Sequence, residues 1–129
     1  MPFTEANAIT LLSSTTIADL SSAAATTLYT VPAGYKAIPT EAWLEVGGNV
    51  AAALVCSIGR STALTDFVGS TNGDNLDADE DVILMAPVPS ATPATNKTYA
   101  AGVIIQFNVS VAGNAVAGKV YLFGFLVAV

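Results

Sequence analysis

The C-terminal run, residues 118–129, constrains the fold more than any other stretch because it has no polar face. In an extended chain, successive side chains point to opposite sides. One side of this strand carries Val120, Leu122 and Leu126, and the other side carries Tyr121, Phe123, Phe125 and Val127. A strand that is apolar on both sides must be covered on both sides. One cover can be the domain's own core, and the other must be an arm, a loop or a neighbouring subunit.

Other stretches alternate between apolar and polar residues and are separated by turn signals rich in Gly, Pro and Asn. The strands expected besides the C-terminal run are 27–31, 36–46, 50–58, 82–85 and 99–111. No stretch shows a helical period. The sequence therefore predicts an all-β fold, an antiparallel β-sandwich that is jelly-roll-like.

Two of these strands predict which side chains enter the core. The inward sets are Ile38, Ala42, Leu44 and Val46 in the first, and Val103, Ile105, Phe107, Val109 and Val111 in the second. Pro39 cannot donate a ladder hydrogen bond, so it predicts either an edge position or a β-bulge.

A chain of 129 residues is expected to form one domain. We assign residues 27–129 to the sandwich and residues 1–26 to an extended N-terminal arm with one or two weak strands. Residues 59–81 are expected to be mostly a connection, anchored in the core by Leu64 and Phe67. Residues 86–97 hold three of the six prolines and are expected to form a loop.

Charged residues make up only 11% of the chain, against about a quarter in typical globular proteins. Such a composition favours a protein that buries surface in subunit contacts, or one whose solvent-exposed surface carries hydroxyl and amide groups in place of charges. The net charge of −6, with four bases and no basic stripe, argues against nucleic-acid and anionic-membrane partners. The N-terminal residues do not resemble a signal peptide, and no apolar run is long enough to span a membrane.

Catalytic chemistry is not expected. The chain has no His, which excludes Ser–His and Cys–His nucleophile pairs and histidine–zinc sites. Glu41 and Glu45 lie four residues apart on one strand, about 13 Å, which exceeds the separation of an inverting glycosidase pair. A pair across two strands is not excluded by the sequence. Cys56 lies in an apolar run and is expected to be a buried, inert thiol. We expect no enzyme activity and no cofactor.

The acids Asp74, Asp77, Asp79, Glu80 and Asp81 are half of the acidic residues in the chain. One interpretation is a solvated acidic loop, and another is a surface that faces a basic patch on a partner. A third is a divalent-cation site, for which Asp74, Asp77 and Asp79 are the candidate ligands. The spacing does not match an EF-hand loop.

Trp43 falls on the polar face of its expected strand, between Glu41 and Glu45. A bulge at Pro39 could turn it into the core. Otherwise it is an aromatic anchor in a contact with another subunit or another protein, or a platform on which a sugar stacks. The candidate interface residues are Trp43, Ile104, Tyr121, Phe123 and Phe125.

Several quoted stretches together carry a resemblance to a known family. They are LYTVPAGYKAI at 28–38, VCSIG at 55–59, the Asp- and Asn-rich loop that follows, and VYLFGFLV at 120–127. Over residues 27–127 the chain resembles the capsid decoration, or cement, proteins of tailed bacteriophages, which have a jelly-roll-like β-sandwich. YTVPAG and FGFL also occur in phage tail and fibre domains.

The resemblance implies a non-enzymatic virion structural protein. Such proteins sit as trimers on three-fold and quasi-three-fold positions of the capsid, with terminal arms touching neighbours. It implies a homotrimer bound to the major capsid protein on the capsid surface, made in the host cytoplasm. The chain lacks the appended immunoglobulin-like or carbohydrate-binding domain of some decoration proteins, so host adhesion is not implied. The alternatives are a tail, fibre or lectin-like module that binds a glycan, and a minor tail or neck component.

Overall fold

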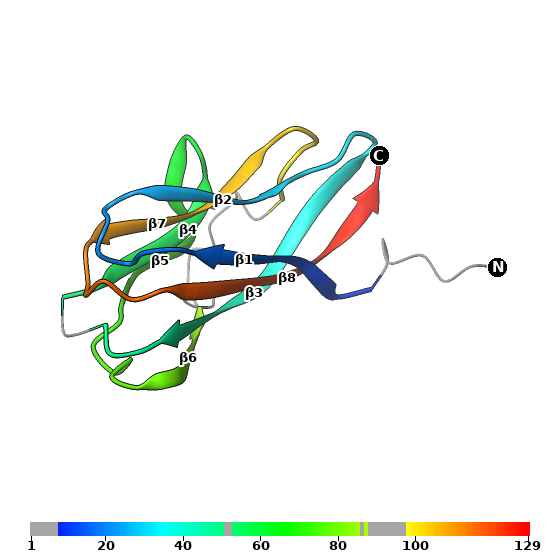
Figure 1. The fold of residues 1–129 in the computed structure, drawn as a ribbon. Coiled ribbons are helices and arrows are strands. Elements are labelled where there is room, and N and C mark those ends of the chain that lie inside the picture. Colours follow the sequence, from blue (N-terminus) through cyan, green and yellow to red (C-terminus); the bar gives the residue numbers. More distant parts are fainter. Residues whose placement is uncertain (1–7, 51–52, 86, 88–97) are drawn as a thin grey trace.

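The computed structural model describes residues 8–50, 53–85, 87 and 98–129. Within these ranges the regular elements are all strands, and they form two packed four-stranded sheets (Figure 1). The strands are β1 (Thr10–Ile17), β2 (Ala25–Thr30), β3 (Tyr35–Gly47), β4 (Val55–Arg60), β5 (Ala63–Asn72), β6 (Asp79–Met85), β7 (Ile104–Val111) and β8 (Gly118–Ala128). The predicted all-β sandwich is confirmed. No helix in the described ranges is long and apolar enough to cross a membrane.

The strand order is that of a jelly roll. One sheet has the order β1-β8-β3-β6 and the other β2-β7-β4-β5. The strands of the first half of the chain pair antiparallel with those of the second half: β1 with β8, β2 with β7, β3 with β6 and β4 with β5. This nesting is what results when one long antiparallel hairpin folds over on itself. The pairings β3–β8 and β4–β7 complete the two sheets.

The core lies between the sheets and follows the alternation read from the sequence. In β8, Val120 and Leu122 are buried, whereas Tyr121 and Phe123 on the other side are only partly buried. The second sheet contributes Ile105 and Phe107, which are also fully buried. The core-facing side of the C-terminal run is therefore covered by the protein itself.

Pro39 lies at a β-bulge and not at a sheet edge, since β3 runs between β8 and β6. The register of β3 against β8 shifts between Pro39 and Glu41. Before the shift Ala37 is buried, and after it Ala42 is buried, so the inward face changes from odd to even positions. A proline is tolerated there because the bulge disrupts the ladder locally.

The bulge corrects one predicted core residue. Ile38, expected to face inward with Ala42, is only partly buried and pairs with Phe125, which lies on the outward side of β8. The physical reason is the extra residue in β3, which reverses the side-chain alternation between these two positions.

Strand β5 was not predicted. Its sequence, ALTDFVGSTN, places only Phe67 and Val68 in the core, and its register against β4 shifts twice. The period-two pattern that reveals a strand is therefore interrupted. The anchor Phe67 is buried as expected, and Leu64 is partly buried.

Two predicted strands begin later than expected. β4 begins at Val55 and not at position 50, and Val50 and Leu54 are buried although the backbone there bonds to loop residues. β7 begins at Ile104 and not at position 99. Tyr99 makes only an isolated bridge to Ala37.

Val111, at the end of β7, was expected to face the core, but its side chain is 48% exposed. It lies at the last position of the strand, where the ladder to β4 also changes register.

Residues 8–26 belong to the sandwich rather than extending away from it. They form β1 and the start of β2, and Ile17 and Leu20 are buried in the core. Residues 1–7 of the expected arm lie outside the described residues, as does the expected loop 86–97 apart from Pro87.

Candidate functional site: an aromatic sheet face

The outer side of sheet β1-β8-β3-β6 holds four of the described aromatic residues, Trp43, Tyr121, Phe123 and Phe125. The register places Trp43 of β3 between Tyr121 of β8 and Leu84 of β6. Directly opposed residues on neighbouring strands share a face and touch. One row of side chains therefore crosses the sheet; it is apolar from Leu84 to Tyr121, over three strands, and continues on β1 as Ser14.

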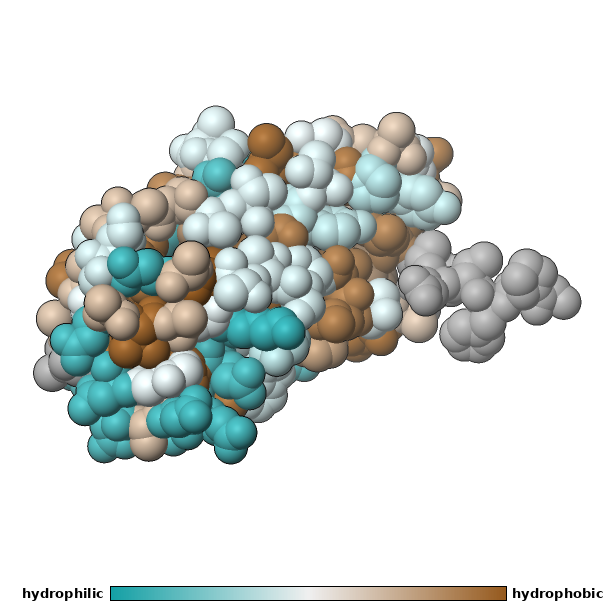
Figure 2. All heavy atoms as spheres, in the orientation of Figure 1, coloured by the Kyte–Doolittle hydropathy of each residue, from teal (hydrophilic) through white to brown (hydrophobic). Residues whose placement is uncertain are grey.

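Two further rows extend this surface. Phe123 of β8 pairs with Leu11 of β1 and with Glu41 of β3, and Phe125 pairs with Ile38. We call the surface formed by Leu11, Ile38, Trp43, Leu84, Tyr121, Phe123 and Phe125 the aromatic face. Figure 2 shows hydrophobic side chains gathered over β1 and β8 in this region.

The aromatic face is accessible. Leu11 and Leu84, at its two borders, have 46% and 48% of their surface exposed, and the aromatic rings between them are partly buried. A contiguous apolar surface of this kind marks an interaction site more often than an isolated exposed residue does.

Trp43 therefore does not enter the core. The bulge at Pro39 is present, but Trp43 lies beyond it on the outward side, between the buried residues Ala42 and Leu44. Of the interpretations of Trp43, the core one is excluded, and the interface and sugar-stacking ones remain.

The aromatic face has a charged border at Tyr121. The Tyr121 hydroxyl donates a hydrogen bond to Glu45 Oε1 at 3.3 Å, and Lys119 Nζ lies 5.6 Å from the centre of the Tyr121 ring. Partial desolvation, the negative charge of Glu45 and the hydrogen bond to it raise the pKa of Tyr121. The hydroxyl is therefore neutral at physiological pH, and the border carries one acid and one base.

Ile104, the fifth candidate interface residue, is not part of this surface. It begins β7 in the other sheet, where it pairs with Thr30 of β2. The structure brings Trp43, Tyr121, Phe123 and Phe125 together and places Ile104 on the opposite sheet.

The acidic residues form a loop and the beginning of β6. The Asp81 carboxylate accepts hydrogen bonds from the backbone N–H groups of Asp77 and Ala78, at 3.0 and 2.9 Å, and Asp74 is held by Asn72. Among the residues that the structure describes, no three acidic, Cys or His side chains converge as metal ligands. Asp74, Asp77 and Asp79 are thus not brought together, and the carboxylates of Asp74 and Asp81 hold the loop in shape.

A shallow hollow of about 220 Å³ lies where β3, β6 and β8 meet. Its charged lining consists of Glu45, Asp79, Glu80 and Lys119. The volume falls below the usual range of pockets that enclose a drug-sized ligand, about 300–1,000 Å³. The hollow can accept a single side chain rather than a whole small molecule.

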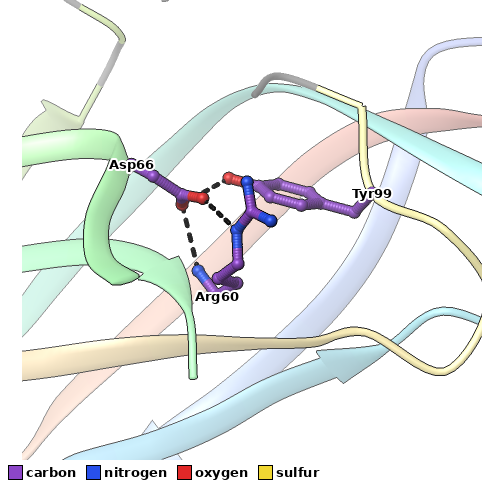
Figure 3. Close-up of polar contacts among 3 residues, drawn as sticks. All are labelled: Arg60, Asp66 and Tyr99. Atoms are coloured by element: carbon purple, nitrogen blue, oxygen red, sulfur yellow. Dashed lines mark hydrogen bonds and ion pairs between the residues drawn. The ribbon is translucent and has the colours of Figure 1, made fainter. Parts of the chain in front are cut away.

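Sequence reasoning missed one polar cluster, which joins Arg60, Asp66 and Tyr99 (Figure 3). The Tyr99 hydroxyl donates to Asp66 Oδ1 at 2.7 Å, the Arg60 backbone N–H donates to the same oxygen at 3.0 Å, and Arg60 Nε donates to Oδ2. The Arg60 guanidinium also lies 5.5 Å from the centre of the Tyr99 ring. The sequence signal that could have revealed this cluster is Asp66, an acidic residue within the otherwise mostly apolar run LTDFV.

This cluster fits a structural role better than a catalytic one. Tyr99 is 1% exposed, and burial, together with the hydrogen bond to Asp66 and its charge, raises the pKa of the phenol. The phenol therefore remains a neutral donor. Both carboxylate oxygens accept hydrogen bonds, so Asp66 has no obvious role as a general base. The cluster ties the segment before β7 to the β4–β5 hairpin.

No family model, curated protein or solved structure matches this chain. Its function is therefore proposed from its own sequence, fold and surface.

Proposed function

We propose that this chain is a non-enzymatic virion structural protein that binds the outer surface of a tailed-phage capsid. In this proposal it assembles as a trimer and stabilises contacts between neighbouring capsomers. The observation that carries the proposal is the aromatic face, an exposed apolar surface on a jelly-roll domain with little surface charge. The sequence resemblance to decoration proteins supplies the trimer and the capsid as expectations.

The chemistry of the aromatic face suits a permanent contact. Trp and Tyr dominate the binding energy of protein interfaces, and such residues contribute most when they lie near the centre of the contact. Trp43 and Tyr121 lie side by side in the middle of the sheet, with Leu11 and Leu84 at its borders. A partner laid across this sheet would bury both rings and leave Glu45 and Lys119 at the rim.

The mechanism requires no reactive group. A protein that binds the assembled lattice but not free capsid subunits stabilises the lattice by mass action. Three copies joined in a trimer bind neighbouring positions together, so each contact can be weak while the whole attachment is strong. Hydroxyl-rich strands such as β1, with its Ser and Thr residues, supply neutral polar surface for such contacts.

A second function, glycan binding, is favoured by one specific observation. Trp43 has Glu41 and Glu45 on the same outward side of β3, so an aromatic ring lies close to carboxylates that can accept sugar hydroxyl hydrogen bonds. This is the rival role of a tail, fibre or lectin-like module.

Trp43→Ala separates the two functions. If the aromatic face is an assembly surface, the variant loses trimer formation and co-sedimentation with capsids that lack the protein. If it is a sugar platform, the variant keeps its native mass and loses binding to a glycan array. Val111→Ala is the matched control, because Val111 is an exposed apolar residue on the other sheet. Equal effects of the two substitutions would contradict both proposals.

A further inference from the structure

Strand β6 forms an outer edge of its sheet, and this edge differs from the other three. The outer strands are β1, β2, β5 and β6. β2 is broken by a register shift after three residues, and β5 by two shifts against β4. Bulges and short runs of this kind protect an edge from pairing with another chain.

The exposed side chains distinguish β6 from β1, the remaining edge. β1 keeps its register over Ser13–Ile17, but the outward side chains there are those of Ser14 and Thr16. The register of β6 against β3 shifts once, between Asp79 and Val82, and is then regular to Met85, with Val82 and Leu84 exposed by 44% and 48%. No described strand pairs with its outer side. A regular edge with exposed aliphatic side chains is a template for one more strand.

The beginning of this edge is strongly negative. Asp77, Asp79 and Glu80 are exposed, and the hollow beside them is lined by Asp79, Glu80 and Glu45, with Lys119 as its one base. Figure 2 shows hydrophilic side chains over β6 and the preceding loop at the lower left. A strand that pairs here is therefore favoured if it carries a basic residue beside Asp79 and Glu80.

We propose that the outer edge of β6 binds an extended, basic segment of another protein by strand addition. Apolar side chains of that segment would pack on Val82 and Leu84, and a Lys or Arg side chain would enter the acidic hollow. The proposed site is the outer edge of β6, which borders the aromatic face at Leu84, and it does not rest on the trimer or the capsid.

In the part of the chain that the structure describes, a second copy offers no free basic strand. Lys36 and Lys119 lie in β3 and β8, which are inner strands, and Arg60 is paired with Asp66; Lys97 lies outside the described residues. The charge pattern therefore favours a basic partner.

The test uses the full-length protein and a fluorescein-labelled peptide, Lys-Thr-Val-Thr-Val-Thr-Lys, with blocked ends, in which the lysines and valines share one face of an extended strand. The lysines at both ends allow either strand direction. We expect saturable binding below about 1 mM by fluorescence anisotropy. A peptide of the same sequence with its internal backbone amides N-methylated should not bind, because it cannot donate ladder hydrogen bonds. No binding by the parent peptide, or equal binding by both peptides, would overturn the proposal.

Leu84→Lys should weaken peptide binding at least tenfold, because it places a positive charge on the pairing edge. The matched control is Leu11→Lys, at the opposite border of the same sheet with a similar exposure, and it should change binding less than twofold. Asp79→Asn combined with Glu80→Gln should weaken binding and flatten its salt dependence. Trp43→Ala removes the neighbour of Leu84 but leaves the edge backbone intact, so it should weaken peptide binding less than Leu84→Lys does while it abolishes assembly through the aromatic face.

Two further results would contradict the inference. Equal losses in Leu84→Lys and Leu11→Lys would show a general surface effect rather than pairing at β6. Self-association without peptide that Leu84→Lys abolishes but Trp43→Ala leaves intact would show that a second copy occupies the edge. Near-ultraviolet circular dichroism checks that each variant is folded before binding is compared.

Discussion

At the scale of single residues, Tyr99 shows how one buried hydroxyl can organise its surroundings. Its ring fills part of the core, while its hydroxyl reaches the carboxylate that also holds Arg60. Buried polar groups of this kind stabilise a fold only when every member has a partner. Here the carboxylate oxygens of Asp66 accept the hydrogen bonds that Tyr99 and Arg60 donate.

We expect Tyr99→Phe to lower the free energy of unfolding by about 1–2 kcal/mol, the usual effect of removing one buried hydrogen bond. Urea denaturation measures it. Tyr29→Phe is the control, since Tyr29 is only partly buried and should change stability by less than about 0.5 kcal/mol. Equal effects of the two substitutions would mean that the bond to Asp66 contributes nothing.

Tyr99 also predicts that the stability of the fold depends on pH. The folded state raises the pKa of Tyr99 above its usual value of 10.0, so folding favours the neutral phenol. Its contribution to stability is therefore complete below pH 10 and declines as the pH rises above that value. Denaturation midpoints should fall more steeply above pH 10 in the wild type than in Tyr99→Phe. Parallel curves would contradict this assignment.

Cys56 should not react with thiol reagents in the native protein. It is fully buried, and desolvation raises its thiol pKa to about 12, so almost no thiolate forms at pH 8. Ellman's reagent should detect the thiol only after urea is added. Rapid labelling without denaturant would show that the strand around Cys56 opens readily.

At the scale of elements, the bulge in β3 depends on Gly124 in the neighbouring strand. A Cβ at this position would lie 2.6 Å from the Ile38 carbonyl oxygen and 2.7 Å from the Pro39 Cα. Both are backbone atoms, so they cannot move aside as a flexible side chain could. The glycine lets β8 approach the place where β3 changes its inward face.

Gly124→Ala should therefore destabilise the protein by about 1–3 kcal/mol, as overpacking does. Gly69→Ala is the matched control, because a Cβ on that strand residue meets no atom within 4 Å. Thermal melts of both variants provide the comparison. A Gly124→Ala variant as stable as the control would show that the two strands separate easily at the bulge.

The sequence predicted the strands whose side chains alternate cleanly, and it failed where geometry interrupts the alternation. Most of β3 was recognised because apolar residues recur every second position, and β8 was recognised because it is a continuous apolar run that follows a turn signal. β5 was missed because Asp66 interrupts its apolar pattern. Asp66 is placed there by its hydrogen bond with Tyr99, 33 residues further along the chain, and no local pattern reveals that contact. Ile38 was assigned to the wrong side because Pro39 indicated a bulge without showing where the faces exchange.

The candidate interface was predicted in part for the same reason. Tyr121, Phe123 and Phe125 share one side of one strand, which local alternation shows directly. That Trp43 lies beside Tyr121, and that Ile104 lies on the other sheet, depends on strand order. Strand order is a property of the whole fold, and single strands do not encode it.

At the scale of the whole molecule, the jelly roll leaves two outer faces, and the aromatic residues gather on one. The acidic loop does not bring three carboxylates together in the described part of the chain. We therefore expect assembly to be independent of divalent cations. Native mass should be the same in EDTA and in millimolar calcium, and a mass that falls in EDTA would indicate a cation site between subunits.

The central claim is that this chain assembles through the aromatic face. The most direct test is native mass by light scattering on a sizing column, over a range of concentrations, for the wild type and for Trp43→Ala. The account predicts a wild-type mass three times the 13.0 kDa of one chain, and a monomer for the variant. A wild-type monomer at every concentration, or a trimer that Trp43→Ala leaves intact, would contradict it.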